Sequence, residues 1–446
     1  MSVTKTLASY VTNAKPADLP EAVKAEASRT FLNWVGCAVG GAQHETLDIA
    51  IAALAPFSGP GIASVLGRRE RLDPLHAALM NGISSHVFDF DDTHLRTVIH
   101  PAGPVASALL AYAEYQPVSG ADFINALVLG VEVECRIGNA VYPAHYDVGW
   151  HITGTTGVFG AAAAIGKLMA LDTRQMSWAF GLAATQPVGL REMFGTMTKS
   201  FHPGRAAQNG MTSALLAQRG YTSSEQGIEA KRGWAHVLSV AFNPDEITEN
   251  LGKSYEIAVN SYKPFACGIV IHPAIDGCIQ LRKSGQVDAM QVRSVTLRVH
   301  YLVLELTGKK TPQTGLEGKF SVYHAAAIAL LKGAAGEREF SDAAVNDPQV
   351  IALRGQINAI VDDSMAPDAV HITMILNDGR VIEHDVEHAI GSIARPMGDA
   401  DLDEKFYGLT DDVLGHERAQ NLCRLCRDVG SLPRVDVVAQ AARLPA

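Results

Sequence analysis

The segment GTTGVFGAAAAIGKLMAL, residues 154–171, decides the fold class of this chain. Its length and its apolar spacing predict a helix, and that helix carries small side chains of its own on nearly every face. Small side chains let neighbouring helices approach closely, so we place this helix at the centre of a helical bundle. Lys167 and the richness in glycine and alanine favour a buried helix over a membrane span.

Further helices are predicted on both sides of this segment, and a different pattern interrupts them. Apolar spacing predicts helices at residues 102–115, 121–141 and 205–219. After Pro264, residues 292–306 alternate and are rich in β-branched side chains, which predicts a strand. Residues 370–376 and 381–386 flank Asn377-Asp378-Gly379-Arg380, a sequence typical of a hairpin turn.

The carboxyl-terminal tail returns to a helical pattern beyond Pro396, with helices expected at residues 399–407 and 411–428. We therefore predict a mainly α fold. Its large all-helical domain comprises residues 1–262 and 397–446, and residues 263–396 form a smaller inserted α+β domain. The six cysteines and the lack of an export signal predict reduced thiols and a cytoplasmic location.

The charge balance limits the class of ligand. The chain carries 37 Lys and Arg against 47 Asp and Glu, a formal net charge of −10. Nucleic-acid binding would require a basic face that neutralises phosphates, so we predict no nucleic-acid partner and no membrane partner. An anionic substrate would need a local basic pocket within this acidic chain.

Basic side chains gather in short segments that precede predicted helices. His100, His151 and Lys199 each lie in such a segment, and His202 and Arg205 follow Lys199 closely. The amino end of a helix favours anions through its free N–H groups and its dipole. Lys263 and His272 lie near the expected domain border. Together these residues predict a basic pocket for an anion.

The acidic run Asp89-Phe90-Asp91-Asp92-Thr93 allows other chemistry. Asp89 and Asp91 match the D-x-D-x-T pattern of phosphatases that use an aspartyl nucleophile and Mg²⁺. Helices rather than a parallel βαβ sheet are expected after this run, so we prefer carboxylates that orient neighbouring cations. The phosphatase remains an alternative, and so does a non-catalytic scaffold that binds an anion.

A second metal pattern, H-x-x-E-H at residues 384–388, falls where the chain alternates like a strand. The two imidazoles would then lie about 13 Å apart, too far for one Zn²⁺. We therefore predict no metal site.

Six segments occur in the order typical of one family and span nearly the whole chain. They comprise residues 88–105, 149–172, 199–210, 262–276, 318–330 and 394–406. On these segments the chain resembles the MmgE/PrpD family, which includes 2-methylcitrate dehydratase, cis-aconitate decarboxylase and iminodisuccinate epimerase. The resemblance implies an all-helical domain built from both chain ends, a smaller α+β lid domain and a homodimer. It also implies small di- or tricarboxylate substrates and no cofactor.

The resemblance further implies site residues. Positions matching Asp89, Thr93, His100, His151, Lys199 and Lys263 line the active site of decarboxylase-like members. Two departures disfavour the decarboxylase. The segment from Thr93 to His100 is one residue longer than in its pattern, and Gly268 replaces a histidine that it carries five residues after its lysine.

These residues predict cofactor-independent proton abstraction from a carbon next to a carboxylate. His100 and His151 are the expected acid–base groups, because imidazoles exchange protons near neutral pH. Lys199 and Lys263 would stabilise the developing negative charge, with Asp89 orienting an imidazole and Thr93 contacting a carboxylate. Further substrate-binding candidates are His202, Arg205 and His272.

Within this chemistry we expect epimerisation of a dicarboxylate amino-acid derivative such as iminodisuccinate. Dehydration of 2-methylcitrate or a similar tricarboxylate is the alternative, and decarboxylation of the cis-aconitate type is less favoured.

Overall fold

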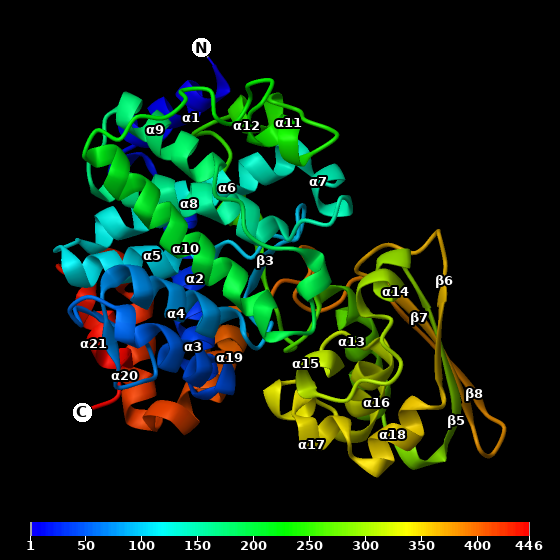
Figure 1. The fold of residues 1–446 in the computed structure, drawn as a ribbon. Coiled ribbons are helices and arrows are strands. Elements are labelled where there is room, and N and C mark those ends of the chain that lie inside the picture. Colours follow the sequence, from blue (N-terminus) through cyan, green and yellow to red (C-terminus); the bar gives the residue numbers. More distant parts are fainter. Residues whose placement is uncertain (1, 446) are drawn as a thin grey trace.

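The computed structural model describes residues 2–445, and Figure 1 shows a large helical part beside a smaller part that contains a sheet. The predicted mainly α fold is confirmed. The helices of the first part are α1 (Val3–Asn13), α2 (Glu21–Gly40), α3 (Glu45–Leu54), α4 (Pro74–His86), α5 (Ala102–Tyr115), α6 (Gly120–Val141), α7 (Ala144–Asp147), α8 (Ile152–Leu168), α9 (Thr173–Ala184), α10 (Met197–Gln218), α11 (Trp234–Leu238) and α12 (Asp245–Thr248).

Helix α8 is the central helix, as its sequence predicts. Each residue from Ile152 to Gly166 is buried, and α8 packs against α5, α6, α9 and α10. Glycines allow the close approach: a Cβ atom at Gly130 of α6 would lie 2.9 Å from the Gly160 carbonyl oxygen. A Cβ atom at Gly210 of α10 would lie 2.5 Å from that of Ala161. The small side chains of α8 therefore place α6 and α10 directly against it.

Short strands complete the helical part. A ladder of β3 (Asp92–His94) and β4 (Asn260–Tyr262) joins the acidic run to the segment that leads into the second part, with Asp92 opposite Tyr262. A separate small ladder pairs β1 (Ala63–Ser64) with β2 (Arg71–Leu72). The β3–β4 pairing places the acidic run beside Lys263, far along the chain.

The second part is a sheet ordered β6-β5-β7-β8, with helices packed on it. Strands β7 (Val370–Leu376) and β8 (Val381–Val386) have the predicted bounds and form the predicted hairpin, whereas β6 (Ile357–Val361) is a strand that the sequence pattern does not predict. Its helices are α13 (His272–Lys283), α14 (Tyr301–Thr307), α15 (Gly315–Gly318), α16 (Val322–Lys332), α17 (Asp342–Val345) and α18 (Pro348–Arg354).

The predicted strand over residues 292–306 is only half right. Strand β5 covers Val292–Val299, and α14 begins at Tyr301. The His300 side chain accepts a hydrogen bond from the Leu302 N–H, so it caps the first turn of α14. This cap ends the strand where alternation of side chains alone predicts that it continues.

The tail folds back onto the first helices as α19 (Asp399–Leu414), α20 (His416–Arg427) and α21 (Asp436–Ala442). Helix α19 packs against α2, where Gly36 and Gly40 face Phe406 and Leu409. Within residues 2–445, one buried apolar cluster joins these tail helices to the first part, and another fills the space between the sheet and its helices. All six cysteines are buried and unpaired.

Among the described helices, none combines the length and the apolar character that crossing a bilayer requires.

Candidate active site

A small cavity of about 50 Å³ lies where the two parts of the molecule meet. Predicted site residues that line it are Asp89, Thr93, His100, His151, Lys199 and Lys263. Other lining residues are Val98, Tyr146, Phe194, Gly268, Ile269, Val270, Leu306, Thr307 and Phe320. The structure therefore brings together six side chains that come from distant positions in the sequence.

The crossing of α4 and α10 sets the position of Lys199. Helix α10 begins at Met197, earlier than the expected start at residue 205, so Lys199 lies in its first turn. Pro203 lies inside α10 and lacks the N–H that would bond the Lys199 carbonyl. At Gly82, an added Cβ atom would lie 2.3 Å from the Gly204 Cα atom. This backbone contact brings the end of α4 to the start of α10.

Asp89 holds two lysines in the cavity wall. Its Oδ1 atom accepts hydrogen bonds from Lys199 Nζ and Lys263 Nζ, each at 2.7 Å. The Asp89 backbone has a φ of 51°, a left-handed conformation that costs energy for a residue with a side chain. Asp89 therefore pairs with lysines, whereas the sequence predicts that it orients an imidazole.

These ion pairs decide the charges in the cavity. Burial raises the pKa of the Asp89 carboxyl, but Lys199 and Lys263 outweigh it and hold that pKa well below its usual range. Burial lowers the pKa of Lys199, whereas Asp89 and Asp91 raise the pKa of Lys263 in spite of its burial. One carboxylate thus faces two ammonium groups, which leaves this wall suited to an anion.

His100 presents an unprotonated nitrogen. Its Nδ1 atom lies 2.7 Å from the carbonyl oxygen of Asp92 and 3.3 Å from Thr93 Oγ1. A carbonyl can only accept, so the proton of the neutral ring lies on Nδ1 and Nε2 keeps its lone pair. Burial lowers the pKa of His100 to about 3, despite the nearby Asp91 carboxylate. The ring is therefore neutral at pH 7, with an unprotonated Nε2 atom.

His151 is the second neutral imidazole at the cavity. It occupies the N-cap position of α8, and the edge of its ring meets Phe194 at a centroid distance of 5.1 Å. Its Nδ1 atom lies 2.8 Å from Nδ1 of His202, so one ring donates and the other accepts. Burial and the neighbouring His202 and Lys199 lower the pKa of His151 well below its usual value.

Three predicted substrate-binding residues lie outside the cavity lining. His202 is buried behind His151, as its hydrogen bond shows. His272 lines a separate, mostly apolar cavity that shares Val98, Ile269 and Val270 with the first one. Arg205 is exposed on α10 and donates to Gln208 Oε1. The late expected start of α10 misplaced Arg205, because this residue follows Lys199 by six positions inside the helix.

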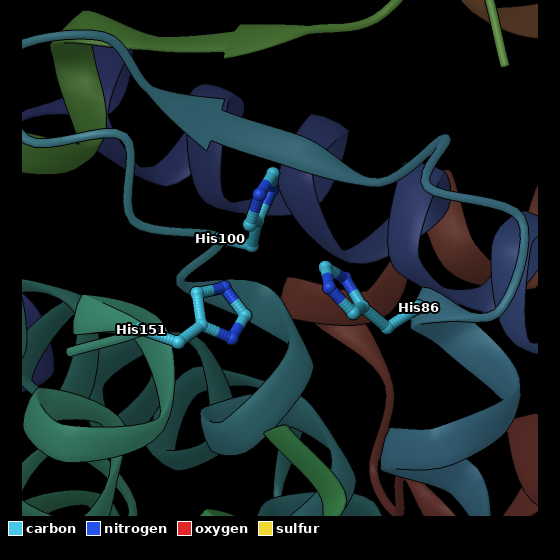
Figure 2. Close-up of side chains that lie close together, drawn as sticks. All are labelled: His86, His100 and His151. Carbon is cyan, nitrogen blue, oxygen red and sulfur yellow. The ribbon is translucent and has the colours of Figure 1, made fainter. Parts of the chain in front are cut away.

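His86 and Asp91 complete the buried cluster, although His86 is absent from the residues that the sequence predicts for the site. His86 Nδ1 lies 2.7 Å from Asp91 Oδ2, and His86 Nε2 lies 3.1 Å from Lys199 Nζ. Figure 2 shows the rings of His86, His100 and His151 around one space. His86 is the last residue of α4, just before the acidic run. Its position next to this run is the feature of the sequence that could have indicated a place in the site.

Some side chains of the cluster lie close enough together for their nitrogen and oxygen atoms to share one metal ion. One such group is His86, His100 and His151, and another is His86, Asp89 and Asp91. Lys199 donates to His86 Nε2, and two ammonium groups share the Asp89 oxygen, so cations already occupy these lone pairs. The same contacts oppose a phosphatase in which Asp89 is the nucleophile.

The chain matches two family models in sequence order. The MmgE/PrpD N-terminal domain matches residues 5–247, and the MmgE/PrpD C-terminal domain matches residues 265–428. The cis-aconitate decarboxylase-like protein oryM of Aspergillus oryzae is 28% identical, with 94% of this chain and 93% of that protein covered.

Two further relatives are more distant. Human cis-aconitate decarboxylase is 24% identical, with 100% of this chain and 95% of that protein covered. The 2-methylcitrate dehydratase of Escherichia coli is 24% identical, with 82% of this chain and 81% of that protein covered. With both family models matched in order across a cavity built from the segments that carry the resemblance, the chain belongs to the MmgE/PrpD family.

Proposed function

We propose that this protein catalyses cofactor-independent proton transfer at a carbon next to a carboxylate in a small di- or tricarboxylate. One observation carries the proposal: two neutral imidazoles and two buried ammonium groups line the same cavity. Neutral imidazoles exchange protons, and ammonium groups bind carboxylates and stabilise the charge that develops on them. This combination suits carbanion chemistry on an anion.

His100 is the proposed base, because within residues 2–445 no hydrogen bond occupies its Nε2 lone pair and its Nδ1–H donates to the Asp92 carbonyl. As the proton leaves carbon, negative charge moves onto the carboxylate oxygens of the substrate. Lys199 and Lys263 lie in the cavity wall and would stabilise that charge, with Asp89 fixing both ammonium groups. Thr93 would contact a substrate carboxylate, and His151 is the second acid–base group.

We propose epimerisation of a dicarboxylate amino-acid derivative such as iminodisuccinate as the complete reaction. An epimerase removes a proton on one face of a carbon and returns it on the other, for which His100 and His151 suffice. Gly268 lines the cavity at the position where the decarboxylase pattern has a histidine, so the cavity lacks that imidazole.

The relatives support a second candidate, a lyase. Those compared above are named for cis-aconitate decarboxylase and 2-methylcitrate dehydratase activities. Dehydration uses the same proton abstraction and adds protonation of a leaving hydroxyl group, which His151 or Lys199 would perform. Decarboxylation is less favoured because of Gly268.

The proposal includes the organisation of the molecule. We divide the chain into an all-helical domain of residues 1–262 and 397–446 and an α+β domain of residues 263–396. The α+β domain would act as a lid, because the cavity takes Gly268 and Phe320 from it and His100 and His151 from the helical domain. The functional unit would be a homodimer, and the buried free thiols suit the reducing cytoplasm.

Proton exchange in D₂O tests the proposal. The protein is incubated separately with iminodisuccinate, 2-methylcitrate and cis-aconitate, and the products are followed by NMR. Deuterium at the carbon next to the carboxylate, with interconversion of stereoisomers and no alkene, identifies an epimerase. New olefinic carbon signals in the ¹³C NMR spectrum of the 2-methylcitrate reaction identify a dehydratase, and loss of carbon dioxide from cis-aconitate a decarboxylase. Absence of exchange and product with all three substrates would refute the proposal.

A further inference from the structure

Asp91 lies between two imidazoles of the cluster, and the mechanism proposed above gives it no role. Its side chain is fully buried. Asp91 Oδ2 lies 2.7 Å from His86 Nδ1, and Asp91 Oδ1 lies 3.6 Å from His100 Nδ1. One carboxylate therefore faces both rings, each through its Nδ1 atom.

The contact with His86 fixes which nitrogen of that ring carries the proton. Burial raises the pKa of Asp91, but His86 and His100 outweigh it and hold that pKa below its usual range, so Asp91 is a carboxylate that only accepts. The His86 proton must then lie on Nδ1, which leaves Nε2 as an acceptor for Lys199 Nζ at 3.1 Å. Burial lowers the pKa of His86, so the ring remains neutral.

This tautomer leaves Lys199 with one N–H for the substrate. An ammonium group has three donors. Lys199 gives one to Asp89 Oδ1 and one to His86 Nε2, and its side chain lines the cavity between Phe194 and Phe320. If His86 carried its proton on Nε2, it would present a donor to the Lys199 ammonium and displace it from this position.

The contact with His100 matters once that ring accepts a proton. Its Nδ1–H already donates to the Asp92 carbonyl, so a proton on Nε2 makes the ring a cation. Lys199, Lys263 and His86 all disfavour that cation, whereas Asp91 favours it. Among residues 2–445, Asp91 Oδ1 has no hydrogen-bond partner, so its charge remains available to His100.

We infer that Asp91 is a positioning residue for both halves of the reaction: it stabilises the His100 imidazolium and keeps His86 in the tautomer that holds Lys199 on the substrate carboxylate. The inference rests on the proposed function and deepens it. In the serine-protease triad, a buried carboxylate likewise holds a histidine in one tautomer, and its replacement by an amide lowers kcat by about 10⁴-fold because the wrong tautomer forms.

Two variants separate the two roles. Asp91→Asn should lower kcat on the order of 10²- to 10⁴-fold, since His100 loses its counter-ion. His86→Gln leaves Asp91 and His100 in place, so it should raise KM more than it lowers kcat. The double variant with both Asp91→Asn and His86→Gln should show the same loss of kcat as Asp91→Asn alone. A purely structural role of Asp91 does not require the two losses to be equal.

Glu134→Gln is the matched control. Glu134 is another fully buried carboxyl, and burial raises its pKa well above the usual value, which favours its uncharged form. Its replacement by an amide keeps the size of the side chain and, within residues 2–445, breaks no hydrogen bond to a residue that lines the cavity, so kcat and KM should stay within about twofold.

The tautomers are measured without substrate, by ¹⁵N NMR of the histidine side chains in the whole protein, with His86→Gln and His100→Gln for assignment. Both rings should be neutral with the proton on Nδ1. A proton on His86 Nε2 would overturn the inference, even if Asp91→Asn does not fold. Unchanged kcat and KM in Asp91→Asn would also overturn the inference. Proton exchange by the wild-type protein would in that case still support the proposed function. If the wild-type protein exchanges no carboxylate proton, the proposed function fails, and the tautomers still decide the positions assigned to Asp91.

Discussion

Two pairs of buried carboxyl groups lie close to the candidate active site, and their pKa values shift in opposite directions. Asp89 and Asp91 have pKa values below the usual range, because lysines and histidines face them and outweigh burial. Burial raises the pKa of Asp92 to about 7 and that of Glu134 well above its usual value. Asp91 and Asp92 are both fully buried, so the groups that each one faces, not its burial, decide the direction of its pKa shift.

The comparison explains how the acidic run contributes to an anion site. Asp89 binds the two lysines that line the cavity, Asp91 accepts from His86 Nδ1, and Asp92 instead accepts from Asn260 and the Ala102 N–H. Glu134 has no hydrogen-bond partner among the described residues. The run therefore adds less negative charge to the site than its sequence indicates.

Asp89→Asn tests the ionised pair and should have the largest effect. It leaves Lys199 and Lys263 buried without their shared carboxylate. Breaking a buried ion pair by removing one partner costs about 3–5 kcal/mol. We expect urea unfolding at neutral pH to show that loss and activity to fall with it. Unchanged stability in Asp89→Asn would mean that the lysines do not depend on this carboxylate.

His100→Gln should reduce activity strongly with little loss of stability. Removal of a general base typically costs about 10²- to 10⁴-fold in rate. Gln has an amide that can still donate to the Asp92 carbonyl, so the fold should remain. Exchange in D₂O measures the rate, and thermal unfolding serves as the control. Full exchange activity in His100→Gln and also in His151→Gln would show that the acid–base assignment is wrong.

Asp92→Asn tests, through pH, the pair whose pKa values are raised. The folded pKa of Asp92 is about 7 and the ordinary value is 3.8, so the folded state holds the proton more tightly. Stability from this group is therefore complete below the unfolded pKa and falls as pH rises to the folded pKa, by about 4 kcal/mol at most. Asp92→Asn should gain stability relative to the wild-type protein over that range, measured by urea unfolding at several pH values.

The opposite sign is expected at Asp89. Its folded pKa is depressed, so its stabilisation is present above the unfolded pKa and is lost as pH falls through the folded value. If the Asp92→Asn difference followed the same slope as that of Asp89→Asn, the contrast between the two pairs would be wrong.

The pH dependence of activity should show the smallest effect. Burial lowers the pKa of His100 to about 3, so the base is neutral well below the pH at which a free histidine gains its proton. We expect kcat/KM to stay nearly constant between about pH 5.5 and pH 7.5, where a free imidazole titrates. Loss of activity with an apparent pKa near 6.5 would place His100 in a more solvated position.

The sequence predicts the fold well wherever the decisive interactions are local. The Asn377–Arg380 turn defines the β7–β8 hairpin, and the small residues of α8 predict its central position. A proline usually lies at the beginning of a helix, but Pro203 lies inside α10. The predicted start of α10 is therefore late. The predicted strand at β5 is too long because the His300 cap, a single side chain, ends it.

The site divides in the same way. Residues next to predicted helix starts, such as His151 and Lys199, do line the cavity. The partnership of His86 with Lys199 depends on how α4 crosses α10, and no local pattern of sequence gives that crossing. That Asp91 rather than Asp89 contacts an imidazole likewise depends on the tertiary positions of Lys263 and His86.

The contact between Gly82 and Gly204 fixes the distance between α4 and α10. It joins main chain to main chain, so it has no rotamers, and the spacing of Lys199 and His86 does not depend on which side chains fill the cavity. Substrate preference can then change through lining positions such as Gly268 without disturbing that spacing. A family that keeps this backbone contact and changes the residues that line the cavity can retain one proton-transfer step while its substrates diversify.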